Sequence, residues 1–81
     1  MVRVRFHPGF QKVYTKVDDN LKKRIKKQIA KIVQHPTIGK PMRYVRKGTR
    51  EVYIGSFRLS YEYEHNKNLL LFRALYHKDE Q

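Results

Sequence analysis

Three side chains in the second half of the chain could together act on a phosphodiester. Arg58 could stabilise the negative charge that develops on a phosphoryl group during its transfer. His77 could give a proton to a leaving oxygen near neutral pH, and the ring of Tyr53 could stack on an unpaired base. This combination predicts a site that binds RNA and could cleave it.

A protein can cleave RNA without a metal or a nucleophile of its own, because the 2′-OH of the RNA can itself attack the phosphate. The protein then supplies positioning, a base, an acid and positive charge. The sequence has no cysteine and no cluster of histidines and carboxylates with the spacing of a metal site. We therefore expect neither a metal nor another cofactor.

The charge of the chain favours a polyanionic partner. The 81 residues include 19 Lys and Arg against 7 Asp and Glu, a net charge of +12. Such a field attracts phosphate backbones, and an acidic partner protein would relieve the self-repulsion. Arg3 and Arg5 interrupt the apolar start of the chain, and the longest apolar run, residues 69–72, is too short to span a bilayer. We expect a soluble, cytoplasmic protein.

The elements that position these groups follow from hydrophobic periodicity. Residues 2–6 alternate as in a half-buried strand, and Pro8 begins a short helix whose apolar face extends to Val17. Asp18 and its neighbours offer an N-cap to a second helix, which Pro36 ends.

The second half of the chain predicts a meander of three strands, at residues 50–54, 57–63 and 69–76, after a basic loop over residues 37–48. The element order is therefore β-α-α-β-β-β. It predicts one α+β domain over residues 1–81, with two layers: two N-terminal helices packed on a small, mainly antiparallel sheet.

Alternation along the strands assigns side chains to the helix-covered face or to the open face of the sheet. Because Val52 and Ile54 suit the core, Tyr53 faces outward, and Glu51 and Arg58 fall in the same outward phase. The last strand is predicted to point Leu70, Phe72, Ala74 and Tyr76 to the core and Leu69, Leu71, Arg73, Leu75 and His77 outward.

Further cations extend the predicted RNA-binding surface beyond the three central side chains. The loop and the start of the next strand contribute Lys40, Arg43, Arg46, Lys47 and Arg50, the sheet contributes Arg73, and the polar face of the second helix contributes Lys22, Lys23, Lys26 and Lys27. Plainer interpretations stay open: a solvated helix face, His77 as a surface residue at a strand end, Arg58 paired with Glu51 or Glu62, and Arg73 paired with Glu62.

The chain resembles the RelE/ParE toxin superfamily of type II toxin–antitoxin operons. The resemblance rests on Gly39-Lys40-Pro41-Met42-Arg43, on the strand motif Gly55-Ser56-Phe57-Arg58-Leu59-Ser60-Tyr61, and on the terminal His77-Lys78-Asp79. It implies a RelE-like fold and a cognate antitoxin with an acidic segment. RelE-type members cut mRNA in the ribosomal A site without a metal, whereas ParE-type members inhibit DNA gyrase and lack the cleavage residues.

By position, the resemblance implies that Arg58 stabilises the scissile phosphate. It aligns His77 with a catalytic histidine of some members, Lys78 with a basic residue of RelE, and Tyr53 with a histidine or arginine of other members. Arg43 matches a basic loop residue. The lysine taken as base in RelE aligns near Glu51 here, which makes Glu51 a candidate base, and the C-terminal tyrosine of several active members has no counterpart.

Three hypotheses follow from these observations. The chain is a ribosome-dependent mRNA endoribonuclease toxin, a ParE-like toxin without nuclease activity, or a basic RNA-binding module of the same topology. For a toxin we expect a monomer when alone and a heteromer with its antitoxin, with the ribosome and mRNA as further partners and no membrane.

Overall fold

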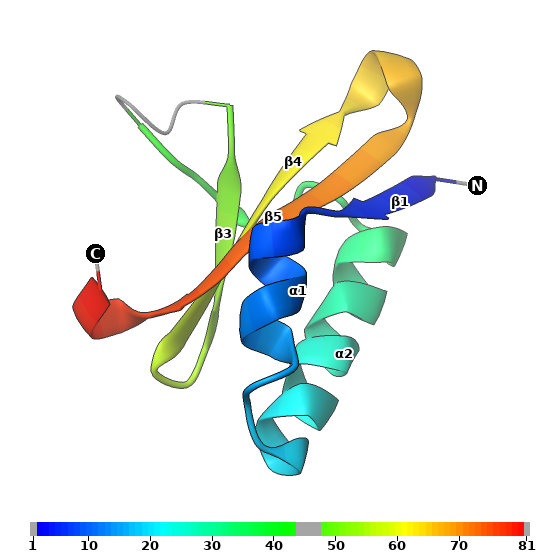
Figure 1. Cartoon of the computed structure of the whole chain (residues 1–81). Coiled ribbons are helices and arrows are strands. Elements are labelled where there is room, and N and C mark those ends of the chain that lie inside the picture. The colour runs from blue at the N-terminus through cyan, green and yellow to red at the C-terminus, as the bar shows by residue number, and fades with distance from the viewer. Residues whose placement is uncertain (1, 44–47, 81) are drawn as a thin grey trace.

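The computed structural model describes residues 2–43 and 48–80 and shows two helices packed against one side of a five-stranded sheet (Figure 1). The predicted α+β class is confirmed. The elements are β1 (Arg3–Phe6), α1 (Pro8–Tyr14), α2 (Asp19–Gln34), β2 (Lys40–Pro41), β3 (Arg50–Ile54), β4 (Phe57–Glu64) and β5 (Leu69–His77), with short 3-10 turns at His65–Lys67 and Lys78–Glu80.

Both helices begin where a side chain caps them. His7 accepts a hydrogen bond from the Gly9 N–H and precedes Pro8, and Asp18 accepts one from the Leu21 N–H at 2.8 Å. Such caps satisfy amide groups that have no partner inside the helix. α1 ends at Tyr14, earlier than its apolar pattern predicts, although Val17 still packs against the core.

The sheet has the strand order β1-β5-β4-β3-β2, with β1 parallel to β5 and the other pairs antiparallel. The residues of strand β2 were expected to belong to a loop. The structure shows instead that both pair with β3, Lys40 with Glu51 and Pro41 with Arg50. The strand is too short for an alternation signal, so only pairing with β3 reveals it. Residues 44–47, which hold the predicted Arg46 and Lys47, lie outside the described residues.

A β-bulge in β5 changes which side chains reach the open face. Ser60 pairs with Ala74, but the next residue of β4, Tyr61, pairs with Phe72, so that the ladder passes over Arg73. An extra residue on one strand reverses the alternation beyond it. The prediction for β5 is therefore correct as far as Phe72 and wrong for residues 74–77.

The core lies between the two helices and the face of the sheet that they cover. It is formed by Phe10, Ile25, Ile32, Ile54, Leu59, Tyr61, Leu70, Phe72 and Leu75. The Tyr61 hydroxyl ties this core to the segment before β2, because it donates to the Pro36 carbonyl at 2.7 Å and accepts from the Gly39 N–H at 2.9 Å. Burial raises the pKa of the Tyr61 phenol, against the smaller opposing effects of the Gly39 N–H and the Arg50 charge, so the hydroxyl stays a donor.

Arg50 holds the same segment from the other side. Its Nη1 donates to the carbonyls of Gly39 at 2.9 Å and Thr37 at 3.1 Å. Arg50 pairs in register with Tyr61, on the helix-covered face. The structure thus places this guanidinium against the backbone that leads into β2, on the other face of the sheet from Tyr53 and Arg58.

Candidate nucleic-acid interface

Three side chains form a row across the open face of the sheet. Tyr53 of β3 lies opposite Arg58 of β4, and Arg58 lies opposite Tyr76 of β5. Directly paired residues project from the same face. The row therefore joins the predicted Tyr53 and Arg58 to a tyrosine that was expected in the core.

The Arg58 guanidinium is held by its own turn and by a ring. Its Cζ lies 3.9 Å from the centroid of the Tyr53 ring, and its Nη1 donates to the carbonyls of Gly55 at 3.3 Å and Phe57 at 3.2 Å. Among the described residues, no carboxylate forms an ion pair with Arg58, because Glu62 pairs with Arg73 at 2.9 Å instead. The Arg73–Glu62 pair, which was left open as an alternative to RNA binding by Arg73, is present. Arg58 keeps a guanidinium with donors available to a ligand.

Glu51 belongs to the open face by register but is 2% exposed. Its carboxylate accepts a hydrogen bond from the Tyr76 hydroxyl, which reaches it from the far side of β4. Ser60, which pairs with Glu51 and lies between the two, is 8% exposed.

His77 is placed on the other face of the sheet from Arg58. It pairs with Phe57, and the two rings make an edge contact with centroids 5.4 Å apart. Its Nδ1 accepts a hydrogen bond from the Asp79 N–H at 3.2 Å and lies 3.4 Å from Asp79 Oδ2. The expected pairing of His77 with Arg58 on one face is wrong, because the bulge at Arg73 reverses the alternation before residue 77 is reached.

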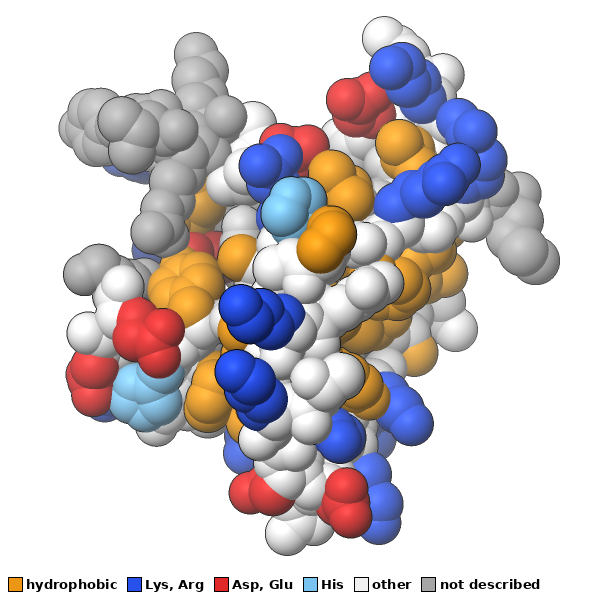
Figure 2. All heavy atoms as spheres, in the orientation of Figure 1, with side chains coloured by type: hydrophobic (Ala, Val, Ile, Leu, Met, Phe, Trp, Pro, Cys, Tyr) orange, Lys and Arg blue, Asp and Glu red, His pale blue; other side chains and the backbone are white. Residues whose placement is uncertain are grey.

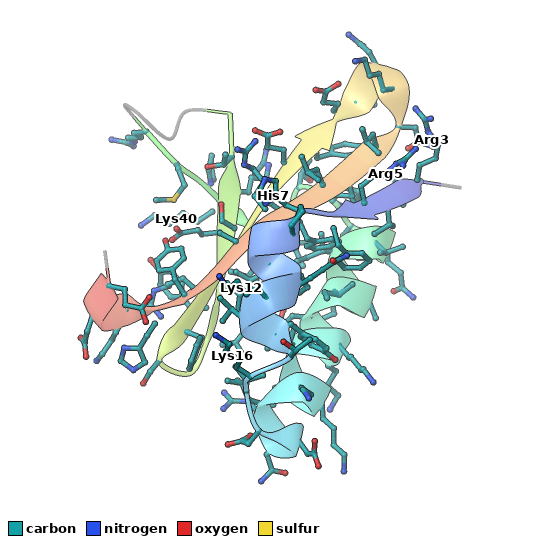
Figure 3. The ribbon with its side chains drawn as sticks, in the orientation of Figure 1. Arg3, Arg5, His7, Lys12, Lys16 and Lys40 are labelled. Atoms are coloured by element: carbon teal, nitrogen blue, oxygen red, sulfur yellow. The ribbon has the colours of Figure 1, made fainter. Side chains whose placement is uncertain are left out.

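Lys78 directly follows β5, as the first residue of the 3-10 turn Lys78–Glu80. It follows Tyr76 by two positions, and its N–H continues the ladder with a hydrogen bond to the Ser56 carbonyl at 2.8 Å. Lys78 is exposed, as are Lys40 and Arg43 near the other side of the row. Figure 3 shows Lys40 beside β3, well apart from Arg3 and Arg5 on β1.

A shallow pocket adjoins this row at the edge of the sheet. It has a volume of about 270 Å³ and is lined by Ile38, Lys40, Glu51, Val52 and Tyr53. The Tyr53 ring beside it is 56% exposed, although it is a large aromatic side chain. An exposed ring next to an exposed lysine can stack on a base while the ammonium binds the adjoining phosphate.

The basic face of α2 forms a separate surface. Lys23, Lys26 and Lys27 are exposed, whereas Lys22 is partly buried with its Nζ 5.8 Å from the centroid of the Tyr14 ring. Arg24 connects this surface with the open face, since a Cβ added at Gly55 would lie 3.2 Å from its guanidinium. Gly55 is the residue whose carbonyl binds Arg58.

Sequence reasoning missed two residues of this region. Tyr76 was assigned to the core because alternation was carried through the bulge, and leucines in both phases of β5 were the available warning. Arg24 was not among the predicted RNA-binding residues, and only the packing of α2 on the β3–β4 turn brings it near Gly55.

Within residues 2–43 and 48–80, no three histidine, cysteine, aspartate or glutamate side chains lie close enough to hold a metal ion. No helix in that part of the chain has the length and apolar character needed to cross a bilayer.

The fold is similar to that of several solved toxins. It matches a RelBE toxin–antitoxin complex from Mycobacterium tuberculosis with a TM-score of 0.82 and 20% identity, covering 94% of this chain and 96% of that one. It matches the intact Escherichia coli RelBE complex with a TM-score of 0.80 and 16% identity, over 93% and 94%. YafQ from Escherichia coli gives 0.75 and 16%, over 99% and 97%.

Comparison of the sequence with family profiles also identifies a toxin family. No curated protein sequence matches significantly. The profile of the family described as "ParE toxin of type II toxin-antitoxin system, parDE" matches residues 4–81, almost the whole chain. The chain therefore belongs to this toxin family of type II toxin–antitoxin systems, within the RelE/ParE superfamily.

Proposed function

We propose that this toxin cleaves mRNA on the ribosome, without a metal, by promoting attack of the RNA 2′-OH on the neighbouring phosphate. The observation that carries the proposal is Arg58, a guanidinium fixed over the Tyr53 ring on the open face with no acidic partner among the described residues. A fixed cation that needs no reorganisation is what a charged phosphorane-like transition state requires.

The other residues of the open face have roles that suit this reaction. Arg58 binds the scissile phosphate, the exposed Tyr53 ring supports a base, and Lys40 and Arg43 bind the flanking backbone. Lys78, the exposed basic residue directly after β5, supplies a further positive charge. Because the proposed target is mRNA on the ribosome, the toxin would act in the cytoplasm.

Gyrase inhibition is the second candidate function, and a specific observation favours it. The matching family profile is the one described by ParE, and the histidine expected to act as acid is not on the Arg58 face. A ParE-like toxin would change DNA supercoiling and leave mRNA intact, so one pair of assays separates the two functions.

The proposed protein partner is an antitoxin with an acidic, amphipathic segment, and the similar RelBE structures are themselves toxin–antitoxin complexes. A cleft formed by β1, α1 and α2 suits such a segment: Phe6, Phe10, Tyr14 and Ile29 line it together with Lys26. Phe6 is 39% exposed, and Figure 2 shows hydrophobic side chains bordered by Lys and Arg on this side of the molecule. A short reading frame with an acidic tail beside this gene would support this partner.

The direct test uses the purified chain and ribosomes programmed with a short synthetic mRNA. We expect a cut in the mRNA on the ribosome, with a 2′,3′-cyclic phosphate on the upstream fragment. A single 2′-deoxy nucleotide at the cut site should abolish the reaction. Intact mRNA, together with altered supercoiling in a gyrase assay, would overturn the proposal in favour of the second function.

Charge reversal on α2 should weaken binding to the ribosome more than it lowers the rate of mRNA cleavage. Changing Lys23, Lys26 and Lys27 together to Glu removes exposed cations that neutralise phosphates, so the slope of log affinity against log salt should become shallower by about 0.7–0.9 per lost phosphate contact. Binding of programmed ribosomes at several salt concentrations measures this slope. The same reversal at Lys67, which pairs with Glu64 at the distant β4–β5 turn, is the control, and an equal effect there would contradict a specific role for α2.

A further inference from the structure

The turn between β3 and β4 carries two guanidiniums, of which the proposed function uses one. Arg58, on β4, donates to the Gly55 carbonyl at 3.3 Å. Arg24 reaches the same residue from α2, because a Cβ added at Gly55 would lie 3.2 Å from both its Nη1 and its Nη2. Two cations from different layers of the fold therefore flank a single residue.

Glycine at position 55 makes this close approach possible. Its φ is +60°, a backbone conformation that residues with a Cβ rarely adopt. A side chain at this position would also press on the Arg24 guanidinium. Arg24, Gly55 and Ser56 are all exposed, so a strand of nucleic acid can approach this turn from the solvent.

Neither guanidinium at this turn is neutralised by a carboxylate of the described residues. The Arg24 guanidinium forms no hydrogen bond or ion pair with any of them, and the ion pairs of Glu62, Glu64 and Asp79 are with other partners. Two like charges repel each other, whereas an anion bound beside both is attracted by both. Guanidiniums bind phosphate strongly, because their planar N–H donors form paired, charge-assisted hydrogen bonds with its oxygens.

We propose that Arg24 binds one of the two phosphates that flank the scissile phosphate of the mRNA, while Arg58 binds the scissile phosphate itself. This inference rests on the proposed function. Successive phosphates of one strand are anions that two cations on either side of one residue can hold together. Arg24 is thus a positioning residue, which sets the register of the strand on Arg58 and touches no reacting atom.

The charge of a flanking phosphate does not change during cleavage, and this determines the kinetic effect of Arg24. A contact that is equally strong in the ground state and in the transition state lowers the toxin concentration needed for reaction without raising the maximal rate. Arg24 should therefore differ from Arg58, whose contact strengthens as charge develops on the scissile phosphate.

The first test measures single-turnover cleavage on programmed ribosomes over a range of toxin concentrations. Arg24→Ala should raise the concentration that gives the half-maximal rate by about 10- to 100-fold, as expected for the loss of one charge-assisted contact. The maximal rate should be nearly unchanged, and Arg24→Lys should recover part of the loss because it keeps the charge. A fall in the maximal rate at an unchanged half-maximal concentration would overturn the positioning role.

The second test identifies the phosphate that Arg24 binds, with synthetic mRNAs that carry one neutral linkage. A methylphosphonate replaces the phosphate before or after the scissile one, and the sugar on its 5′ side is 2′-deoxy both there and in a matched mRNA with an ordinary phosphate. At one of the two positions, the neutral linkage should cost the wild type about as much as Arg24→Ala does and should cost the variant almost nothing. Full sensitivity of Arg24→Ala at both positions would overturn the proposal.

Lys31→Ala is the matched control for this coupling. Lys31 is another exposed cation of α2, and it lies about two turns, or about 10 Å, further along the helix than Arg24. This variant should keep the full sensitivity of the wild type to the neutral linkage. The same loss of sensitivity in Lys31→Ala would assign the effect to the charge of α2 as a whole and would overturn a specific contact by Arg24.

The outcomes separate the role of Arg24 from the function on which it rests. Wild-type cleavage without coupling between Arg24 and either flanking phosphate overturns the role of Arg24 alone. A shift in Arg24→Ala that follows only from a lowered folded fraction, measured by thermal unfolding, also overturns it. If the wild type does not cleave the ordinary mRNA, the proposed function and the role of Arg24 fail together.

Discussion

Replacement of Arg58 by alanine is expected to lower the cleavage rate about 10²- to 10³-fold, the loss typical when one fixed donor to a developing oxyanion is removed. Binding of the chain to ribosomes should change little, because Lys23, Lys26 and Lys27 lie on a separate surface. The physical reason is that Arg58 is already fixed by the Tyr53 ring and two carbonyls before substrate binds. Single-turnover cleavage and ribosome binding, measured on the same preparations, separate the two effects.

Two further variants sharpen this prediction. Arg58→Lys keeps the charge but loses the planar fork and its stacking on Tyr53, so it should recover only part of the rate. Arg5→Ala removes one charge from the exposed strand β1, away from the open-face row, and should leave the rate unchanged (Figure 3). A loss of affinity as large as the loss of rate in Arg58→Ala would mark this residue as a general phosphate anchor.

Replacement of Gly39 by alanine is expected to destabilise the fold by about 1–3 kcal/mol, as overpacking of a close-packed site does. A Cβ at this position would lie 2.6 Å from the Tyr61 hydroxyl, 2.8 Å from its ring and 3.0 Å from the Arg50 Cβ. The Tyr61 ring is fully buried and has no free space to move into. Thermal unfolding measures the effect, at about 4–8 °C for each kcal/mol in a domain of this size.

A double-mutant cycle tests whether the Tyr61 hydroxyl causes this cost. Tyr61→Phe alone should destabilise by about 1–3 kcal/mol, because the Gly39 N–H and the Pro36 carbonyl lose their partner. Combined with Gly39→Ala, it should cost less than the sum of the two single changes, since the nearest clash and both hydrogen bonds involve the same hydroxyl. Strict additivity would contradict this account of the segment before β2.

Much of the fold follows from local signals in the sequence. The bounds of β3 match the predicted residues, and the Asp18 cap and the proline at the first helical position, Pro8, begin both helices where expected. These features depend on residues close together in the chain: a capping side chain, a proline, or an alternation bounded by turn residues. The Tyr53–Arg58 pair was also predictable, because both strands keep regular alternation through the turn at Gly55.

The errors concern features that only long-range pairing determines. The bulge that passes over Arg73 arises from the register between β4 and β5. Leucine in both phases of β5 shows that its alternation is ambiguous but does not locate the bulge. It exchanges Tyr76 for His77 on the site face. Arg50 likewise has the sequence of a surface cation, and its structural task appears only when residues 37–39 fold back against it.

The most direct measurement is the mapping of mRNA 5′ ends in cells after brief expression of the chain, beside Arg58→Ala expressed to the same level. This account predicts new 5′-hydroxyl ends inside translated reading frames, in phase with codons, which disappear when translation is blocked and are far fewer with the variant. Growth arrest by the wild type with no new mRNA ends and with altered DNA supercoiling would contradict it.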